Sequence, residues 1–198
     1  MNLPNKLTVS RFAMTALFLW ALFSPWKYSE TTALILFSLA SFTDYLDGRI
    51  ARARNLITNF GILMDPLADK ILTCSAFIAF AESTHLNPAA PVKVSAWMVI
   101  VIVARELAIT GLRLLAASKN VVLAAERYGK HKTISQIACI IALLVVDAMN
   151  EWPAGLKNLF APWTPMFAQI MLWITIALTA VSGALYLWRN RELYLDDV

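Results

Sequence analysis

Apolar residues gather in six long segments, and most charged residues lie in the shorter stretches between them. A helix needs roughly 17 to 25 mainly apolar residues to cross a bilayer, and each segment is near that length. The segments cover residues 8–25, 31–48, 61–81, 93–116, 133–149 and 166–188. No linker, repeat or change of composition divides them. The pattern predicts a single domain over residues 1–198, an all-α bundle of six transmembrane helices.

The composition agrees with an integral membrane protein. Of the 198 residues, 59% are hydrophobic and 15% are charged, whereas a soluble domain is nearer half apolar and a quarter charged. The net charge of +4 suits anionic lipids or an anionic substrate. No motif for reading nucleic acid is present, so we expect no nucleic-acid partner.

Basic residues between the segments fall mainly on one side of the predicted bundle. On that side lie Lys6, Arg11, Arg49, Arg52, Arg54, Lys119, Arg127, Lys130, Lys132, Arg189 and Arg191, against Lys27, Lys93 and Lys157 on the other. The positive-inside bias then places both termini in the cytoplasm, as an even number of spans requires. Residues 2–8 are expected to form a short amphipathic segment at the cytoplasmic interface.

Four aspartates lie at the cytoplasmic ends of the second and third segments. Asp44 and Asp47 are three residues apart and Asp65 and Asp69 are four apart, so each pair shares one face of a helix. One Asp at a membrane helix centre costs roughly 2.5 to 3.5 kcal/mol, so four unpaired ones would cost on the order of 10 kcal/mol. Positive charge close to these aspartates must therefore neutralise them.

A pair of divalent cations would balance these carboxylates. Oxygen ligands at this density suit Mg²⁺ or Mn²⁺, and four carboxylates are enough for two ions with shared ligands. Gly48 leaves room for a bulky group, and Arg52 would present a cation to a phosphate. A carboxylate-lined transporter is the alternative from another class, although the acids cluster at one membrane face and no inverted repeat is visible.

The same stretch resembles the complete signature of the CDP-alcohol phosphotransferases. It reads Asp44-x2-Asp47-Gly48-x2-Ala51-Arg52-x8-Gly61-x3-Asp65-x3-Asp69. The resemblance implies a dimeric membrane enzyme of six helices that transfers a phosphatidyl or similar group from a CDP-linked lipid to an alcohol and releases CMP. It implies that the four aspartates bind metal, that Asp69 is also the general base, and that the CDP-lipid contacts Gly48, Arg52, Thr58, Thr8 and Ser10.

The second half of the chain carries cations that suit an anionic acceptor. Arg105 and Arg113 are eight residues apart, about two helical turns, and can share one helix face. Lys130 and Lys132 precede the fifth segment on the same predicted side of the membrane. Together they predict a pocket for the phosphate of a phosphorylated alcohol. In the alternative, Arg105 pairs with Glu106 and the lysines only follow the positive-inside bias.

These cations, with Asn5-x2-Thr8-x2-Arg11 near the start, resemble one branch of the family. That branch uses CDP-diacylglycerol as donor and sn-glycerol 3-phosphate as acceptor. Branches that accept inositol phosphate, serine or a lipid remain open. The resemblance implies an enzyme of phospholipid synthesis in the inner or plasma membrane, with its active site facing the cytoplasm.

Overall fold

The structure is a computed structural model that describes residues 3–54, 59–87, 89–119, 121 and 128–195. Side chains at positions 3–8, 44–54, 59–69, 128–131 and 195 lie outside this description. Within the described ranges the regular structure is helical and contains no strand. The helices are α1 (Leu3–Leu22), α2 (Ser29–Arg54), α3 (Asn59–Leu86), α4 (Ala96–Ser118), α5 (Tyr128–Ala148), α6 (Ala154–Phe160), α7 (Thr164–Arg189) and α8 (Glu192–Leu195).

The six long helices correspond to the six predicted segments, so the prediction of an all-helical chain is confirmed for these residues. Two short helices, α6 and α8, were not predicted, because four to seven residues are too few to show a helical period. The expected amphipathic segment at the N-terminus is not separate: α1 runs without a break from Leu3 into the first apolar segment.

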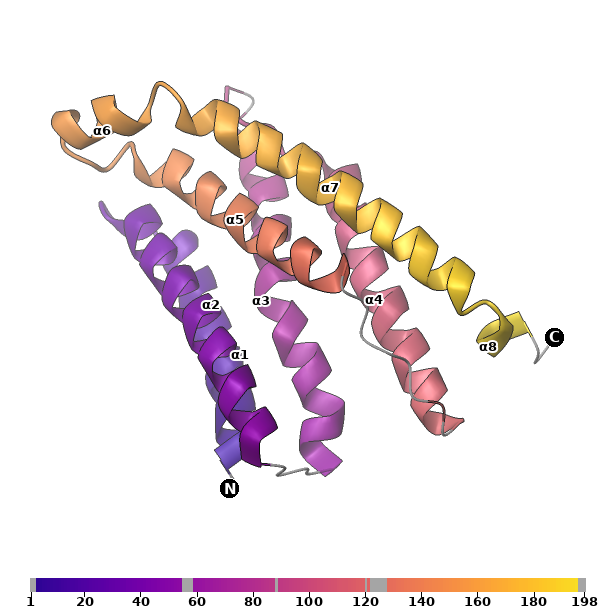
Figure 1. The fold of residues 1–198 in the computed structure, drawn as a ribbon. Coiled ribbons are helices and arrows are strands. Elements are labelled where there is room, and N and C mark those ends of the chain that lie inside the picture. The colour runs from indigo at the N-terminus through magenta and orange to yellow at the C-terminus, as the bar shows by residue number, and fades with distance from the viewer. Residues whose placement is uncertain (1–2, 55–58, 88, 120, 122–127, 196–198) are drawn as a thin grey trace.

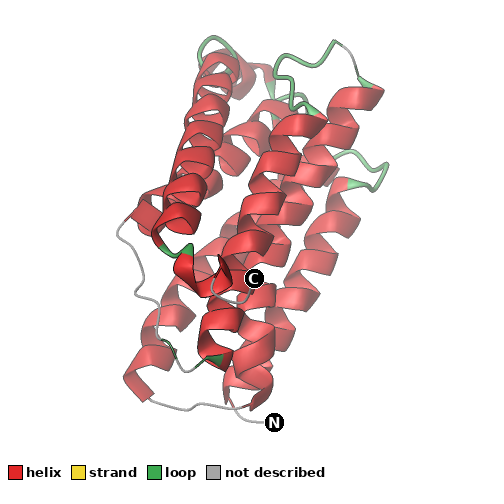
Figure 2. Ribbon diagram, turned by 90° about the vertical axis from the view of Figure 1, so that its right-hand side faces the viewer, coloured by secondary structure: helices red, strands yellow, loops and turns green. Residues whose placement is uncertain are grey.

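The long helices pack as a closed ring (Figures 1 and 2). Following the packed pairs, α1 lies against α2, α2 against α5, α5 against α7, α7 against α4, α4 against α3, and α3 against α1. A further contact joins α3 to α5 across the ring. Helix α3 therefore has α1, α4 and α5 as neighbours, and a residue on it can face several helices.

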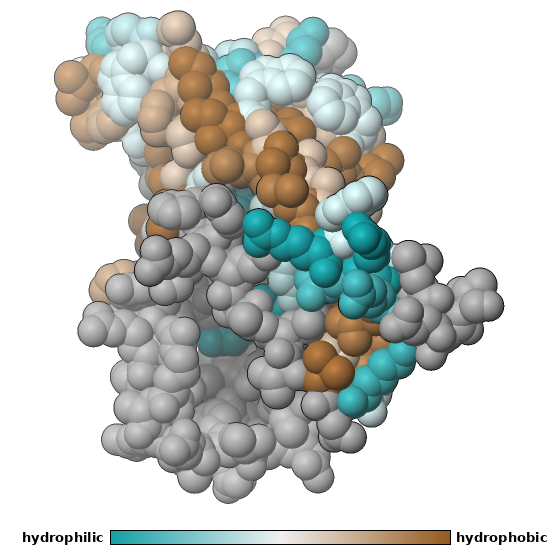
Figure 3. All heavy atoms as spheres, turned by 45° about the vertical axis from the view of Figure 1, so that its right-hand side comes forward, coloured by the Kyte–Doolittle hydropathy of each residue, from teal (hydrophilic) through white to brown (hydrophobic). Residues whose placement is uncertain are grey.

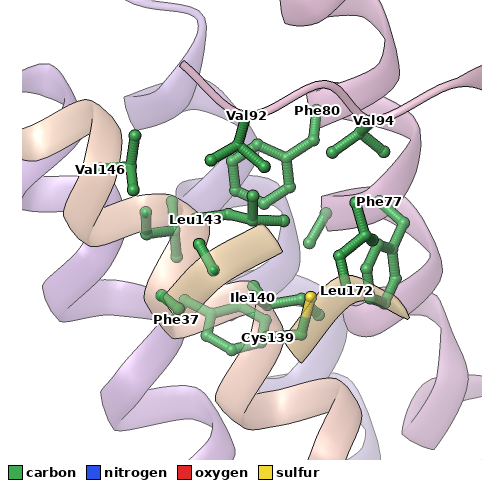
Figure 4. Packing of buried hydrophobic residues seen from close by; sticks show 14 of the residues in the cluster. Phe37, Phe77, Phe80, Val92, Val94, Cys139, Ile140, Leu143, Val146 and Leu172 are labelled. Atoms are coloured by element: carbon green, nitrogen blue, oxygen red, sulfur yellow. The ribbon is translucent and has the colours of Figure 1, made fainter. Parts of the chain in front are cut away.

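Large apolar side chains from several helices pack together inside this ring (Figure 4). Phe37 of α2, Phe77 of α3, Ile140 of α5 and Leu172 of α7 are all at most 1% exposed. They belong to one cluster that also includes Phe18 of α1, whose ring centroid lies 5.5 Å from that of Phe37. This packing sets the relative positions of the helices that carry the polar residues below it.

Much of the outer surface is apolar. Met166, Ile170 and Val181 of α7 are 70%, 46% and 59% exposed, and Figure 3 shows apolar side chains covering the upper part of one face above a hydrophilic band. Among the described residues, Thr164–Arg189 is long and apolar enough to cross a membrane, and Val9–Leu22 is a shorter apolar helix. The count of six membrane spans stays a prediction.

The connection after α5 caps the start of α2. The two carboxylate oxygens of Glu151 accept hydrogen bonds from the backbone N–H groups of Glu30 and Thr31, each at 2.8 Å. The indole of Trp152 donates to the Thr31 hydroxyl at 3.1 Å. Because the first N–H groups of a helix lack partners within the helix, one carboxylate here satisfies two of them and ties α2 to α5.

Replacing Glu151 with Ala should therefore destabilise the bundle by about 1–3 kcal/mol, since a charged cap with two hydrogen bonds is lost. We expect a thermal melt in detergent to show a Tm lower by about 2–4 °C for each kcal/mol. Glu82→Ala, which removes an exposed carboxylate from α3, is the matched control and should leave Tm unchanged. Equal Tm values for the two variants would contradict the cap.

A second prediction concerns Glu30, which precedes the apolar segment 31–48. Burial raises the pKa of Glu30 from 4.5 to about 7, and the charges of Asp147 and Glu151 add to the shift. An unfolded chain then releases this proton at lower pH than the folded one, so stability falls as pH rises from about 4.5 to about 7. Glu30→Gln should raise Tm above pH 7 and change it little near pH 4, as thermal melts across this range would test. A Tm difference independent of pH would contradict the assignment.

Candidate active site

The four signature aspartates lie in two helices that follow one another in the chain. Asp44 and Asp47 belong to α2 and Asp65 and Asp69 to α3, so each pair is helical, as its spacing predicts. Asp44 lies ten residues before the end of α2 and Asp69 ten residues after the start of α3, which is about 15 Å along each axis. Both pairs are thus at a similar height in the bundle. Their side chains lie outside the described residues.

The chemistry of this donor set fits divalent metal. Four carboxylates offer only oxygen atoms, which are the ligands that Mg²⁺ and Mn²⁺ prefer. The side chains that the structure describes contain no other group of three or more His, Cys, Asp or Glu able to hold a metal ion. We therefore keep Asp44, Asp47, Asp65 and Asp69 as the candidate metal ligands.

The residues predicted to contact the CDP-lipid are placed only in part. Gly48 and Arg52 lie in the last turns of α2. Thr8 and Ser10 lie in α1, which packs against both α2 and α3. Ser10 is exposed, whereas the side chains of Arg52 and Thr8 and the whole of Thr58 lie outside the described residues. The first turns of α1 are thus near the helices that carry the aspartates.

Two of the predicted acceptor cations meet on one carboxylate. The Lys132 ammonium of α5 forms an ion pair with Oε1 of Glu106. Arg105 Nη1 donates to the same oxygen at 3.3 Å. Glu106 and Lys132 are only 3% and 5% exposed. The pairing of Arg105 with Glu106 that the alternative expected is therefore present, and Lys132 takes part in it. Because Lys132 is buried, it is not a solvent-exposed charge that only follows the positive-inside bias.

Helix α7 supports Arg105 from the other side. Arg105 Nη2 donates to the Ser182 hydroxyl at 3.4 Å. The next residue, Gly183, leaves space for the arginine stem, because a Cβ built on it would lie 2.7 Å from Arg105 Cγ. A cluster of three helices, α4, α5 and α7, thus holds one acid and two cations.

Arg113 also reaches α7, two turns further along α4. Its Nε donates to the Tyr186 hydroxyl at 3.5 Å, and its guanidinium carbon lies 5.9 Å from the centre of the ring. Tyr186 packs with Ile109 and Leu112 in a small apolar cluster between the two helices. Arg105 and Arg113 therefore share the α7-facing side of α4, as expected. Lys130 lies in α5, and its side chain is outside the described residues.

Lys70 connects the two halves of the site. It follows Asp69 directly in α3, and this helix packs against α4 and α5, which carry Arg105, Glu106 and Lys132. Three cations and one carboxylate leave these four side chains with a net charge of +2. A phosphate monoester carries about −1.5 to −2 near neutral pH, so the excess charge suits such a ligand.

Sequence reasoning had assigned no role to Lys70 or Ser182, only a packing role to Gly183, and to Glu106 only the pairing with Arg105 in the alternative interpretation. Glu106 carried a usable signal, because an acid inside an apolar segment is costly unless a cation balances it. Ser182 and Gly183 had no such signal, since small residues in apolar helices are common and usually serve packing. Only their position opposite Arg105 distinguishes them.

A family comparison decides between the two classes that these residues left open, a phosphotransferase and a carboxylate-lined transporter. The model for CDP-alcohol phosphatidyltransferases matches residues 1–181 of the chain. The chain belongs to the CDP-alcohol phosphatidyltransferase family. The match includes both aspartate pairs, Arg105, Glu106 and Lys132, and α7 as far as residue 181.

Several curated proteins resemble this phosphatidyltransferase over most of its length. A protein of Bacillus subtilis (strain 168), named CDP-diacylglycerol–glycerol-3-phosphate 3-phosphatidyltransferase, is 39% identical, and the match covers 96% of each chain. A protein of Rickettsia felis with the same name is 31% identical over 93% of each chain. A third of that name, from Sodalis glossinidius, is 32% identical over 73% of this chain and 77% of its own.

Proposed function

We propose that this protein transfers the phosphatidyl group of CDP-diacylglycerol to sn-glycerol 3-phosphate and forms phosphatidylglycerophosphate and CMP. The observation that carries the proposal is the adjacency of Asp69 and Lys70. It connects the four aspartates to the cations of the predicted acceptor site. Asp69, the candidate base, and the cation Lys70 are consecutive residues of α3, and α3 packs against α4 and α5, which carry Arg105, Glu106 and Lys132. The relatives' names and the excess positive charge both support a phosphorylated acceptor.

The proposed reaction is a substitution at phosphorus. Asp69 accepts the proton of the acceptor's terminal hydroxyl, and that oxygen attacks the phosphorus bonded to the diacylglycerol group. The bond from this phosphorus to the bridging oxygen breaks, and CMP leaves with the electron pair. An unperturbed aspartate, with a pKa of about 3.9, is a weak base. Either the site raises its basicity by removing water or a nearby cation makes the hydroxyl more acidic.

The remaining candidate residues bind and orient the two substrates. Arg105, Arg113, Lys130 and Lys132 hold the phosphate of the acceptor, which places its hydroxyl beside Asp69. Gly48, Arg52, Thr58, Thr8 and Ser10 contact the CDP-lipid. Two Mg²⁺ or Mn²⁺ ions held by Asp44, Asp47, Asp65 and Asp69 would neutralise the pyrophosphate and stabilise charge on the leaving group.

We further propose that the six long helices all cross the membrane. The exposed apolar surface of α7 supports contact with lipid, and the excess of basic residues at one end of the bundle supports cytoplasmic termini. The active site would then face the cytoplasm from the inner or plasma membrane. A homodimer is the assembly that the family resemblance favours.

The test is CMP release by the purified protein with CDP-diacylglycerol and Mg²⁺. Parallel reactions contain glycerol 3-phosphate, glycerol, inositol phosphate, serine or no acceptor, and the lipid product is identified by mass. We expect turnover with glycerol 3-phosphate and none with glycerol, because the cation cluster needs the phosphate. Turnover with a different acceptor instead would overturn the acceptor assignment, and folded protein that releases no CMP with any acceptor would contradict the proposed reaction.

A further inference from the structure

Glu106 occupies a position where a charge is costly. It lies on the buried stripe of α4 that includes Ile102, Ile109 and Leu112, and it is 3% exposed. An ionised carboxylate in such a place is stable only when cations and hydrogen bonds replace the lost water. An apolar residue would fill the stripe without that cost, so packing alone does not explain this acid.

The partners of Glu106 are the cations that the proposed reaction uses. One oxygen, Oε1, accepts from Lys132 of α5 and from Arg105 of the same helix. Both cations would otherwise repel each other, because two like charges that reach the same buried oxygen lie close together. The shared carboxylate offsets this repulsion and holds the two donors a fixed distance apart.

The same region keeps donor capacity for a ligand. Arg105 Nε and the buried amide Nε2 of Gln136 have no hydrogen-bond partner among the described residues. Gln136 is 2% exposed and lies one turn after Lys132 in α5, on the same side of the helix. Buried donors without partners are costly, and an anion with several acceptor oxygens would satisfy them.

Helix α7 restricts where Arg105 can lie. Its stem passes over Gly183, and its Nη2 atom donates to Ser182. The close approach involves Cγ, which is near the root of the side chain and cannot move without shifting the whole guanidinium. Glu106 therefore fixes the position of the Arg105 guanidinium, and the space at Gly183 fixes the position of its aliphatic stem.

We propose that Glu106 and Gly183 are positioning residues that hold Arg105 and Lys132 as one preassembled site for the phosphate of the acceptor. The inference rests on the proposed function for the identity of the acceptor. Neither residue contacts the reacting atoms in this scheme. Each acts through the two cations and controls acceptor binding rather than donor binding.

Glu106→Gln tests the carboxylate, since the amide keeps the size of the side chain but removes its charge. Lys132 then lies buried without an anionic partner, which disfavours its charged form. We expect the KM for glycerol 3-phosphate to rise about 10- to 100-fold, as for loss of a charged hydrogen bond. The KM for CDP-diacylglycerol should stay within about twofold, because the donor is held elsewhere.

Gly183→Ala tests the arginine stem, and the alanine does not itself weaken α7, because Ala favours a helix more than Gly does. The added methyl group must displace Arg105, and we expect about a tenfold rise in KM for glycerol 3-phosphate. Gly111→Ala is the matched control: it changes a helical glycine of α4 at which a Cβ meets nothing within 4 Å, and it should leave both KM values unchanged.

The experiment separates this inference from the proposed function. Wild-type protein that uses only unphosphorylated acceptors would overturn both. If the wild type uses glycerol 3-phosphate, and both variants fold and keep its KM, the function stands and the positioning role is wrong. A lower kcat with both KM values unchanged would make the two residues merely structural and also overturn the inference. Should Glu106→Gln fail to fold, the comparison of Gly183→Ala with Gly111→Ala decides.

Discussion

Replacing Asp69 with Asn should lower the kcat for CMP release by about 10²- to 10⁴-fold, the usual contribution of a general base. The amide has nearly the shape of the carboxylate and keeps an oxygen for coordination, but it cannot accept the proton of the attacking hydroxyl. Binding of CDP-diacylglycerol should largely persist. Steady-state kinetics at saturating substrates, with equilibrium binding of labelled CDP-diacylglycerol, would measure both effects.

Glu82→Gln is the matched control for this variant. It makes the same exchange of acid for amide in α3, at an exposed position 13 residues further along, and should leave turnover at the wild-type level. The acidic limb of the wild-type pH–rate profile should also disappear in Asp69→Asn, because the group that must lose its proton is gone. Near-normal turnover in Asp69→Asn would contradict the assignment of the base.

Removing divalent metal should have an effect of similar size. Chelation with EDTA leaves four carboxylates on two consecutive helices, α2 and α3, without a counter-charge, and the leaving group without charge stabilisation. Metal ions contribute several kcal/mol to such reactions, so we expect turnover to fall about 10³-fold. Added Mg²⁺ or Mn²⁺ should restore it. EDTA saturated with Mg²⁺ before addition is the control and should not inhibit.

A binding measurement distinguishes a metal site from a general salt effect. Mg²⁺ should raise the Tm of the protein without substrates, since a ligand that binds only the folded state stabilises it. Asp47→Asn should move this effect to higher Mg²⁺ concentrations, whereas Glu82→Gln should not. Full turnover in chelated protein would exclude the metal site, and an equal response of Tm in both variants would remove Asp47 from it.

The helices were predictable because each long helix of the bundle coincides with an apolar segment that is long enough to cross a bilayer. Segment ends were less accurate: α2 begins at Ser29 and continues to Arg54, six residues beyond the predicted end at 48. The extra turns carry the charged residues after Asp47, and hydropathy counts these as a break although the helical hydrogen bonds continue through them. Polar residues of a site and polar residues of a loop look alike in such a pattern.

The candidate site also has one part that local sequence rules predict and another part that they do not. Both aspartate pairs could be placed on helix faces from their spacing, because residues three or four apart always meet on one helix face. Arg105 and Lys132 are 27 residues apart on different helices, and no local rule relates them. Their meeting on Glu106 depends on the packing of α4 against α7 and of α5 against α7.

By itself, the sequence determined the helical class, the positions of the aspartate pairs and the need for balancing cations. These features depend on helical periodicity and on the cost of placing charge in an apolar segment, and both can be read from neighbouring residues. Only the tertiary structure decided that Lys132 and Arg105 share one carboxylate and that Gly183 makes room for Arg105. Such contacts depend on the angles and heights at which separate helices cross, and side-chain packing of the whole bundle sets these.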